Sequence, residues 1–259
     1  MSKTRLEAVL FDYGHTLVDF TVPEDALHDV YGRIRLRLVE EANVELPAAP
    51  ELVELVARRV TRAVDASYGR DRLLELDILA LFEEALGALG FTPSAETVRW
   101  VAEVEHRALS AHLVSPPEII ATIAAIHDAG LKIGVVSNAH LLPDLMRENW
   151  MDLGFGQFVD ASVISSEIGK RKPHPAIFEA ALRELGVAPA AALFVGDRAL
   201  DDVGGAHQMG MRAVLTTEFS GSTGRAASEE EAAALLAEKP ELVVDSLPQI
   251  LPYVMSLIA

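Results

Sequence analysis

The sequence has 259 residues, half of them hydrophobic, which is enough for a large core or for one core with a smaller module. Asp and Glu (39) outnumber Lys and Arg (22), and the resulting net charge of −17 argues against binding to nucleic acid or to an anionic membrane. The lack of cysteine excludes disulfides, thiolate metal ligands and a cysteine nucleophile, and no apolar run approaches the roughly 20 residues of a membrane span.

The first predicted element is a short buried strand at residues 6–11, which ends directly before Asp12. The next strand signal comes only at residues 132–136. Apolar residues between these strands recur at three- and four-residue spacing, which is typical of amphipathic helices. Four such helices are predicted, at residues 26–42, 51–68, 73–89 and 95–112. Together they predict a small helical bundle.

Helices and strands alternate after Pro116, with short links between them. The predicted helices are 118–129, 141–150, 176–185, 202–209 and 247–258. The predicted strands are 132–136, 158–164, 192–195, 212–216 and 242–244, and a loop followed by an Ala/Glu-rich helix is predicted at 220–238. This alternation predicts an α/β fold with a doubly wound parallel sheet covered on both faces. We expect residues 1–17 and 116–259 to form this core, and residues 18–115 to form an inserted helical module.

Two of the predicted strands end on a carboxylate, Asp12 after the first and Asp197 after the strand at 192–195. Ligands bind outside the carboxyl ends of strands in open α/β sheets, so both residues are candidates for a site. Two neighbouring carboxylates form a dianionic pocket that is costly without a cation. Because carboxylate oxygens suit hard cations, the pattern favours Mg²⁺ as a cofactor.

Further polar residues follow predicted strands or interrupt loops. Ser137 and Asn138 come after the strand at 132–136, where a hydroxyl and backbone amides would make an anion site or a simple helix cap. Lys172 lies in a loop with Lys170 and Arg171, where a lysine could neutralise a phosphoryl group in a transition state. The alternative interpretation of these three cations is a solvated basic loop.

Taken in order, four motifs resemble those of the haloacid dehalogenase-like hydrolase superfamily, most of whose members are magnesium-dependent phosphatases. The motifs are Asp12-Tyr13-Gly14-His15-Thr16-Leu17, Ser137-Asn138, Lys172-Pro173-His174-Pro175 and Gly196-Asp197 with Asp201-Asp202. The resemblance implies that the inserted helical module acts as a mobile cap over the active site.

The resemblance also implies the role of each site residue. Asp12 matches the family's nucleophile and metal ligand, and Lys172 its catalytic lysine. The family's other metal ligands are matched by the Gly14 carbonyl, Asp197 and Asp202. Asp201 fits a variant of the same motif with shorter spacing, and one of these two adjacent aspartates could instead cap a helix. The remaining expected contacts, to the substrate phosphoryl group, come from Thr16, Ser137 and Asn138.

One position departs from the family pattern, because Gly14 stands where the family's phosphatases carry a second aspartate that acts as general acid and base. Such acid–base help is typically worth about 10²–10⁴-fold. A phosphatase with this gap would turn over slowly, would depend on good leaving groups, or would take its proton from His15 or from a histidine of the module, His28 or His112.

Three other functions have to be weighed against a phosphatase. A haloacid dehalogenase needs no second aspartate, but the acidic residues Asp197, Asp201 and Asp202 argue against it. A phosphonatase would need a lysine in the helical module, and residues 18–131 contain none. A protein that binds phosphoryl ligands without turnover has no need of the nucleophile Asp12.

The sequence therefore predicts a magnesium-dependent hydrolase, and we expect a phosphatase that acts on a small phosphorylated metabolite through an aspartyl-phosphate on Asp12. The charged first residues do not resemble a signal peptide, so we expect a cytoplasmic protein. Arg33, Arg37 and Tyr68 are candidate substrate contacts in the module, with surface ion pairing as the alternative. The sequence specifies neither the substrate nor an oligomeric state.

Overall fold

The computed structural model describes residues 4–20, 23–70, 72–220, 233 and 237–258. The chain divides into an α/β unit, residues 1–19, 114–139 and 150–259, and a helical unit, residues 20–113 and 140–149. The segment 140–149 groups with the helical unit because Leu142 and Leu145 pack into its core. The chain passes between the units within two short strands that pair with one another, β2 (Asp19–Phe20) and β3 (Leu113–Val114), and again at 139–140 and 149–150.

The α/β unit is built on a six-stranded sheet in which every strand pair is parallel. Its strands are β1 (Ala8–Phe11), β4 (Lys132–Ser137), β5 (Ala161–Ile164), β6 (Ala192–Gly196), β7 (Arg212–Thr216) and β8 (Leu242–Val244), in the order β5-β4-β1-β6-β7-β8. All residues of β1 and β6 are buried, as expected for central strands of a parallel sheet covered on both faces. The predicted α/β fold is confirmed.

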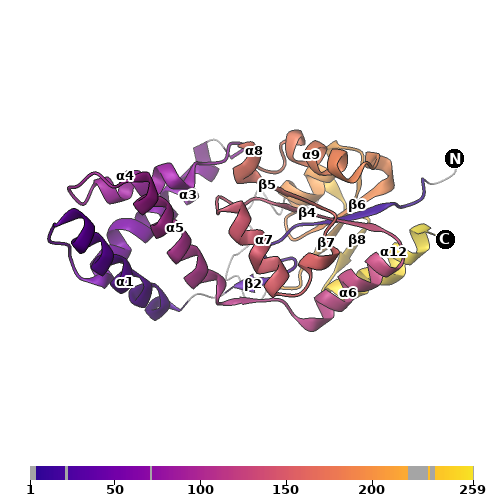
Figure 1. Cartoon of the computed structure of the whole chain (residues 1–259). Helices are drawn as coiled ribbons and strands as arrows, with labels where there is room; N and C mark the ends of the chain where they lie inside the picture. Colours follow the sequence, from indigo (N-terminus) through magenta and orange to yellow (C-terminus); the bar gives the residue numbers. More distant parts are fainter. Residues whose placement is uncertain (1–3, 21–22, 71, 221–232, 234–236, 259) are drawn as a thin grey trace. The chain divides into compact units, whose positions relative to one another are not determined.

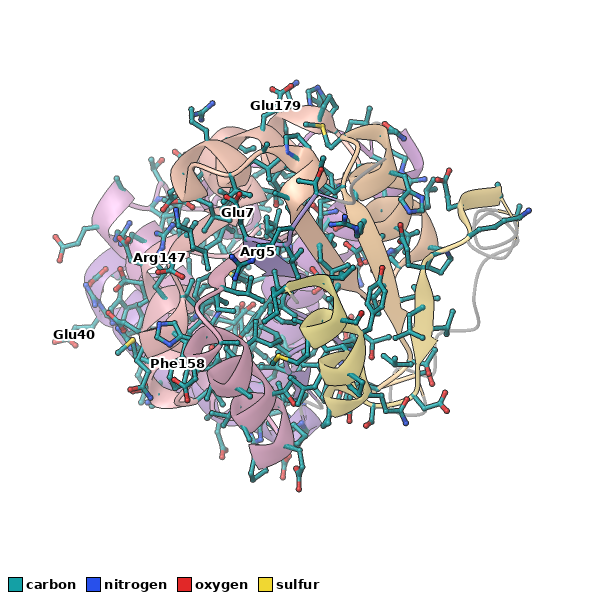
Figure 2. All side chains as sticks on the ribbon, turned by 90° about the vertical axis from the view of Figure 1, so that its right-hand side faces the viewer. Arg5, Glu7, Glu40, Arg147, Phe158 and Glu179 are labelled. Carbon is teal, nitrogen blue, oxygen red and sulfur yellow. The ribbon has the colours of Figure 1, made fainter. Side chains whose placement is uncertain are left out.

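Helices cover both faces of this sheet (Figure 1). Helices α6 (Pro117–Asp128) and α12 (Leu251–Ile258) pack against each other on one face, and α9 (Pro175–Leu185) and α10 (Gly205–Gln208) do so on the other. Exposed charged side chains such as Glu7 and Glu179 lie on the outside of the unit (Figure 2). The apolar side of α9 is turned to the sheet, since its buried Phe178 packs against Phe194 of β6.

Several elements begin or end elsewhere than predicted. Helix α7 (Pro143–Asp152) begins two residues late, because Pro143 suits the first turn of a helix and disfavours helical backbone before it. Strand β5 starts only at Ala161, after the 3₁₀ turn η2 (Gly156–Phe158). A π-helical turn, η4 (Ala199–Gly204), precedes α10, so this helical segment begins before Asp202.

The remaining elements of the α/β unit are short: α8 (Ser165–Ile168), η3 (Pro189–Ala191) and η5 (Leu247–Ile250). The loop and Ala/Glu-rich helix predicted at 220–238 lie almost entirely outside the described residues.

The helical unit consists of residues 143–149 of α7 together with α1 (Glu24–Ala42), α2 (Ala49–Leu52), η1 (Val53–Ala57), α3 (Arg58–Arg70), α4 (Ile78–Gly87) and α5 (Ala95–Ser110). Its core is formed by apolar residues that recur along these helices, such as Val30, Ile34 and Leu38 of α1. Helix α4 begins later than predicted because the Asp77 side chain accepts hydrogen bonds from the backbone N–H groups of the first turn. None of the helices among the described residues is both long and apolar enough to cross a membrane.

Candidate active site

Asp12 and Asp197 lie side by side because the strands that carry them are neighbours in register. Phe11 of β1 pairs with Val195 of β6, and the backbone N–H of Asp12 donates to the Val195 carbonyl at 2.9 Å. From β1 the chain continues to β4 and β5 on one side, and it returns to β6 on the other. The two carboxylates thus flank the point where the strand order reverses, which is where ligands bind in open α/β sheets.

Asp202 reaches the same place from the π-helical turn η4, and a glycine makes the approach possible. A Cβ atom built on Gly196 would lie 2.2 Å from Oδ2 of Asp202 and 2.4 Å from its Cγ, distances that no real side chain allows. The backbone N–H of Arg198 donates to the same Oδ2 at 3.0 Å. The Asp202 carboxylate is therefore packed directly over the end of β6.

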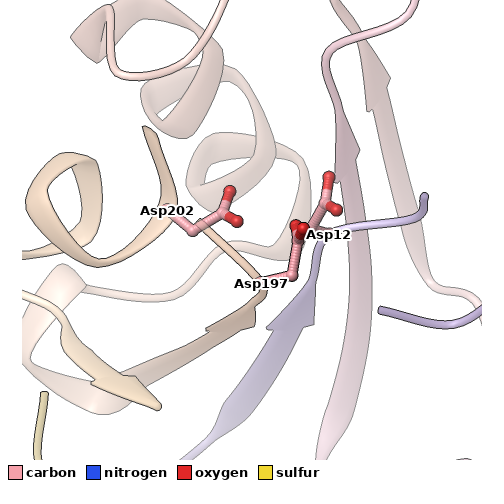
Figure 3. Close-up of side chains that lie close together, drawn as sticks. All are labelled: Asp12, Asp197 and Asp202. Carbon is pink, nitrogen blue, oxygen red and sulfur yellow. The ribbon is translucent and has the colours of Figure 1, made fainter. Parts of the chain in front are cut away.

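Asp12, Asp197 and Asp202 form a compact cluster, with one carboxylate oxygen of each within 4.8 Å of the others (Figure 3). Burial, together with the charge of Asp202, raises the pKa of Asp12 to about 6. Burial, with the charges of Asp12 and Asp202, raises the pKa of Asp197 to about 8. The carboxylates destabilise one another, and a bound cation would relieve this repulsion.

Lys172 supplies the positive charge in this cluster. Its ammonium lies 2.5 Å from Oδ1 of Asp12 and 2.7 Å from Oδ1 of Asp202, and it donates to the Val136 carbonyl at 2.9 Å. Burial opposes the charged form, but the two carboxylates outweigh it and hold the pKa of Lys172 above its usual value. With one ammonium against three carboxylates, the fully ionised site keeps a net charge of −2.

Asn138 fixes the backbone of Lys172. Its Nδ2 donates to the Lys172 carbonyl at 3.1 Å, and the Lys172 N–H donates to Asn138 Oδ1 at 2.6 Å. On the far side of the cis Lys172–Pro173 peptide, the His174 side chain accepts from Ala176 N–H and caps α9. Arg171 and Lys172 are buried, so the interpretation of this loop as solvated is wrong for both residues.

The other residues expected to contact a phosphoryl group lie around the same edge of the sheet. Ser137 is the buried last residue of β4. Thr16 is fully buried, and its hydroxyl donates to Asp12 Oδ2 at 3.3 Å. Ser165 was not predicted from the sequence, and its hydroxyl accepts from Ala139 N–H at 2.8 Å and donates to the Ala139 carbonyl at 3.2 Å. Ser165 directly follows the strand predicted at 158–164, and this position at a strand end marks it as a candidate site residue.

Asp201 and Asp202, which the sequence could not separate, take different places. Asp202 joins the cluster around Lys172, whereas the Asp201 carboxylate lies 2.8 Å from Nε of Arg198. Both carboxylates are buried. The geometry therefore favours Asp202 over Asp201 as a metal ligand.

Gly14 and His15 occupy the turn that follows Asp12. His15 has a φ of 60°, in the left-handed region that non-glycine residues seldom adopt, and its Nδ1 lies 3.4 Å from Oδ1 of Asp19. The ring of the preceding Tyr13 packs against Trp150, with centroids 5.6 Å apart. Aromatic packing and the His15–Asp19 pair therefore both fix this turn.

Of the candidate contacts in the helical unit, Arg37 is engaged within that unit. Its guanidinium lies 4.2 Å from the ring centroid of Trp100, and it pairs with Glu41 and, at 3.8 Å, with Glu96. Arg33 is exposed and Tyr68 is half-buried. The surface ion pairs weighed as an alternative thus account for the surroundings of Arg37.

Comparison with known proteins agrees with this geometry. Residues 6–210 match the haloacid dehalogenase-like hydrolase family, and the chain belongs to that family. It is therefore a hydrolase. It is 33% identical over 206 residues to a glyceraldehyde 3-phosphate phosphatase of Methanopyrus kandleri, covering 80% of this chain and 82% of that protein. It is 32% identical over 225 residues to a phosphoserine phosphatase of Thermus thermophilus, covering 81% and 88%.

A solved structure shares the fold over nearly the whole chain. The 2-haloacid dehalogenase of Pseudomonas syringae pv. Tomato superposes with a TM-score of 0.65 at 24% identity, covering 98% of this chain and 100% of that one. At this identity the likeness supports the fold and does not choose between dehalogenase and phosphatase chemistry.

Replacing Gly196 by alanine tests the packing of Asp202. The added methyl group must displace the Asp202 carboxylate, so we expect Gly196→Ala to weaken Mg²⁺ binding at least tenfold and to cost about 1–3 kcal/mol of stability. Isothermal titration calorimetry and denaturant unfolding measure the two effects. Gly204→Ala is the matched control, because its Cβ would come no closer than 3.3 Å to the Glu238 side chain and 3.5 Å to the Ala199 carbonyl oxygen. Equal Mg²⁺ affinity in Gly196→Ala and wild type would contradict the role of Asp202 as a metal ligand.

The raised pKa of Asp197 predicts that any divalent cation bound at this cluster displaces protons, and Mg²⁺ is the cation to test. At pH 7 a carboxyl with a pKa of about 8 is mostly protonated, so binding should release about one proton, and almost none above pH 9. Calorimetric titrations in buffers of different ionisation enthalpy measure this number. A binding heat that does not depend on the buffer at pH 7 would refute the prediction.

The same shift predicts how the stability of the metal-free protein depends on pH. The folded pKa of Asp197 lies above the unfolded value of 3.8, so its protonation stabilises the fold fully at low pH, and this contribution is lost as the pH rises through 8. Melting temperatures measured in EDTA should fall between pH 6 and pH 8, and this fall should be smaller in Asp197→Asn.

Proposed function

We propose that the protein is a magnesium-dependent phosphatase that acts on a small phosphorylated metabolite through an aspartyl-phosphate on Asp12. One observation carries the proposal: the Asp12 carboxylate lies at the end of a buried strand, within a cluster of three carboxylates that also holds a buried lysine. The phosphatase names of two relatives at 32–33% identity support it.

The residues at the site have the chemistry that Mg²⁺ requires. Asp12, Asp197 and Asp202 offer three carboxylate oxygens close together, and the Gly14 carbonyl is a fourth candidate ligand. Burial and the neighbouring carboxylates raise the pKa values of Asp12 and Asp197, and a divalent cation would favour the ionised form of both groups. Bound there, Mg²⁺ would offset the negative charge of the substrate phosphoryl group.

The side chains around Asp12 divide the chemical work. Lys172 and Thr16 hold the two oxygens of Asp12 and so orient the carboxylate for attack. Ser137 and the backbone amides that follow it would bind phosphoryl oxygens. An oxygen of Asp12 forms a bond to phosphorus as the bond to the substrate oxygen breaks, and water then cleaves the acyl-phosphate to free Asp12 and phosphate.

The leaving oxygen needs a proton that Gly14 does not supply. The leaving groups of aryl and acyl phosphates depart readily without a proton, so we expect the site to favour such substrates. His15 is the candidate donor in this turn, since Asp19 holds its Nδ1 and so sets the direction of the ring.

Halide displacement is the second candidate function, because dehalogenases of this family also work without a second aspartate. The family's dehalogenases typically lack the Gly-Asp pair that magnesium needs, whereas this chain has Gly196 and Asp197. The cluster of Asp12, Asp197 and Asp202 therefore favours a phosphatase. A protein that only binds phosphoryl ligands would not need the close Lys172–Asp12 pair.

Hydrolysis of p-nitrophenyl phosphate tests the proposal. We expect turnover by the wild type that requires Mg²⁺ and falls about a thousandfold or more in Asp12→Asn, which loses the nucleophile. The control Asp128→Asn changes an exposed carboxylate and should keep full activity. Chloride release from 2-chloropropionate, measured beside it, reports halide displacement. Chloride release without phosphate release would refute the phosphatase proposal and support halide displacement instead.

Gly14→Asp tests the missing acid. An aspartate there can protonate the leaving group, so turnover of an alkyl phosphate should rise by about 10²-fold or more, and that of p-nitrophenyl phosphate should rise much less. The ratio of kcat/KM for the two substrates measures the effect. A fall for both substrates at unchanged melting temperature would mean that Gly14 makes room for the substrate or for another catalytic group.

A further inference from the structure

The helical unit contains a cavity of its own, with a volume of about 80 Å³. Helices α3, α4 and α5 line it together with residues 140–142. Its walls are mostly apolar, with Phe82, Ala102 and Leu109 among them. A single water molecule needs about 10–15 Å³ on the same scale, so the cavity admits an organic group of several non-hydrogen atoms.

A carboxyl group without a counter-charge lies at this cavity. The Tyr31 hydroxyl, which is fully buried, donates to Glu105 Oε2, and no cationic side chain among the described residues pairs with Glu105. Burial raises the pKa of Glu105 to about 7, against the opposing effect of the Tyr31 hydrogen bond. An ionised carboxylate in an apolar wall is costly unless a cation accompanies it.

The other titratable groups that line the cavity are two histidines. His106 is buried, its Nε2 lies 3.0 Å from the Asn149 amide nitrogen, and burial lowers its pKa to about 4, which keeps it neutral. His140 lines the same cavity. Within the described part of the chain, the residues that could form a three-ligand metal site lie elsewhere, at Asp12, Asp197 and Asp202.

We propose that this cavity binds the ammonium group of a small aliphatic amine, with Glu105 as its counter-ion. The ammonium supplies the charge that Glu105 lacks, and the apolar walls receive the methylene groups of the amine. A neutral ligand would leave the carboxylate as costly as before, and the lack of a second and third ligand disfavours a metal ion. The amine is a free small molecule that acts as an effector.

The pH dependence of binding separates an ammonium from a neutral ligand. Binding of an ammonium requires ionised Glu105, so its affinity should rise between pH 6 and pH 8. The titratable groups that face Glu105 are Tyr31, His106 and His140. His106 remains neutral throughout this range, and burial with the nearby Glu105 charge holds the pKa of Tyr31 well above it.

Binding of n-butylamine and of its neutral isostere n-butanol to the full-length protein tests the proposal, by calorimetry and melting temperature at pH 8. We expect n-butylamine to bind, to raise the melting temperature by a few degrees and to bind more weakly at pH 6, whereas n-butanol should have no effect. Glu105→Gln, which can still accept from Tyr31, should lower the amine affinity at least tenfold. Glu103→Gln, two residues earlier on the same helix, should not, because Glu103 pairs with Arg99.

Ala102→Leu gives a second test that keeps Glu105. The larger side chain fills the cavity and should abolish amine binding even if Glu105→Gln were to unfold the protein. Equal binding of n-butylamine and n-butanol, unchanged amine affinity in Glu105→Gln, or unchanged affinity in Ala102→Leu would each overturn the proposal. None of these readouts needs phosphatase activity, so the proposed function can fail without affecting them.

Discussion

The structure of the site depends on the contact between one ammonium and two carboxylates in the interior of the protein. Lys172 lies between Asp12 and Asp202, at 2.5 and 2.7 Å, and all three side chains are almost completely buried. Removal of one partner from a buried ion pair typically costs about 3–5 kcal/mol, and the whole fold is usually stable by only about 5–15 kcal/mol. The loop of Lys172 and the turn of Asp202 are thus fixed by their charges as well as by packing.

Close backbone approach makes this contact possible. Gly196 has no Cβ, so Asp202 can lie directly over the end of β6. Gly205 has a similar role in the helix that follows, because a Cβ there would lie 2.5 Å from the Phe178 ring and 3.3 Å from the Pro173 backbone. The turn that carries Asp202 can therefore pack against the loop that carries Lys172. Charge attraction and the absence of two side chains act together to build one site.

The elements that could be predicted are those whose hydrophobic pattern directly reflects their burial in the structure. The buried strands before Asp12 and Asp197 are continuous apolar runs, and their common orientation follows from the helices between them. The boundaries that differ are set by single side chains, such as Pro143 at the start of α7 and Asp77 at the start of α4.

The contacts that complete the site leave no local pattern in the sequence. The hydrogen bonds of Asn138 to the Lys172 backbone join residues 34 positions apart, and the contact of Lys172 with Asp12 spans 160 positions. Similarly, the separation of Asp201 from Asp202 depends on which of two adjacent carboxylates faces Arg198, which only the turn geometry decides.

Two half-buried carboxyl groups in this chain, Asp197 and Glu105, have different surroundings, and the contrast bears on what each could bind. Asp197 shares its surroundings with two other carboxylates and a lysine, so its raised pKa is the product of a crowded charged site. Glu105 has only a tyrosine hydroxyl for a partner, and its raised pKa comes from burial alone. Asp197 lies where a divalent cation would bind several oxygens, whereas Glu105 offers one carboxylate in an apolar cavity, which suits a monovalent organic cation. The number of oxygens at each place therefore distinguishes the charge and size of the cation that each can hold.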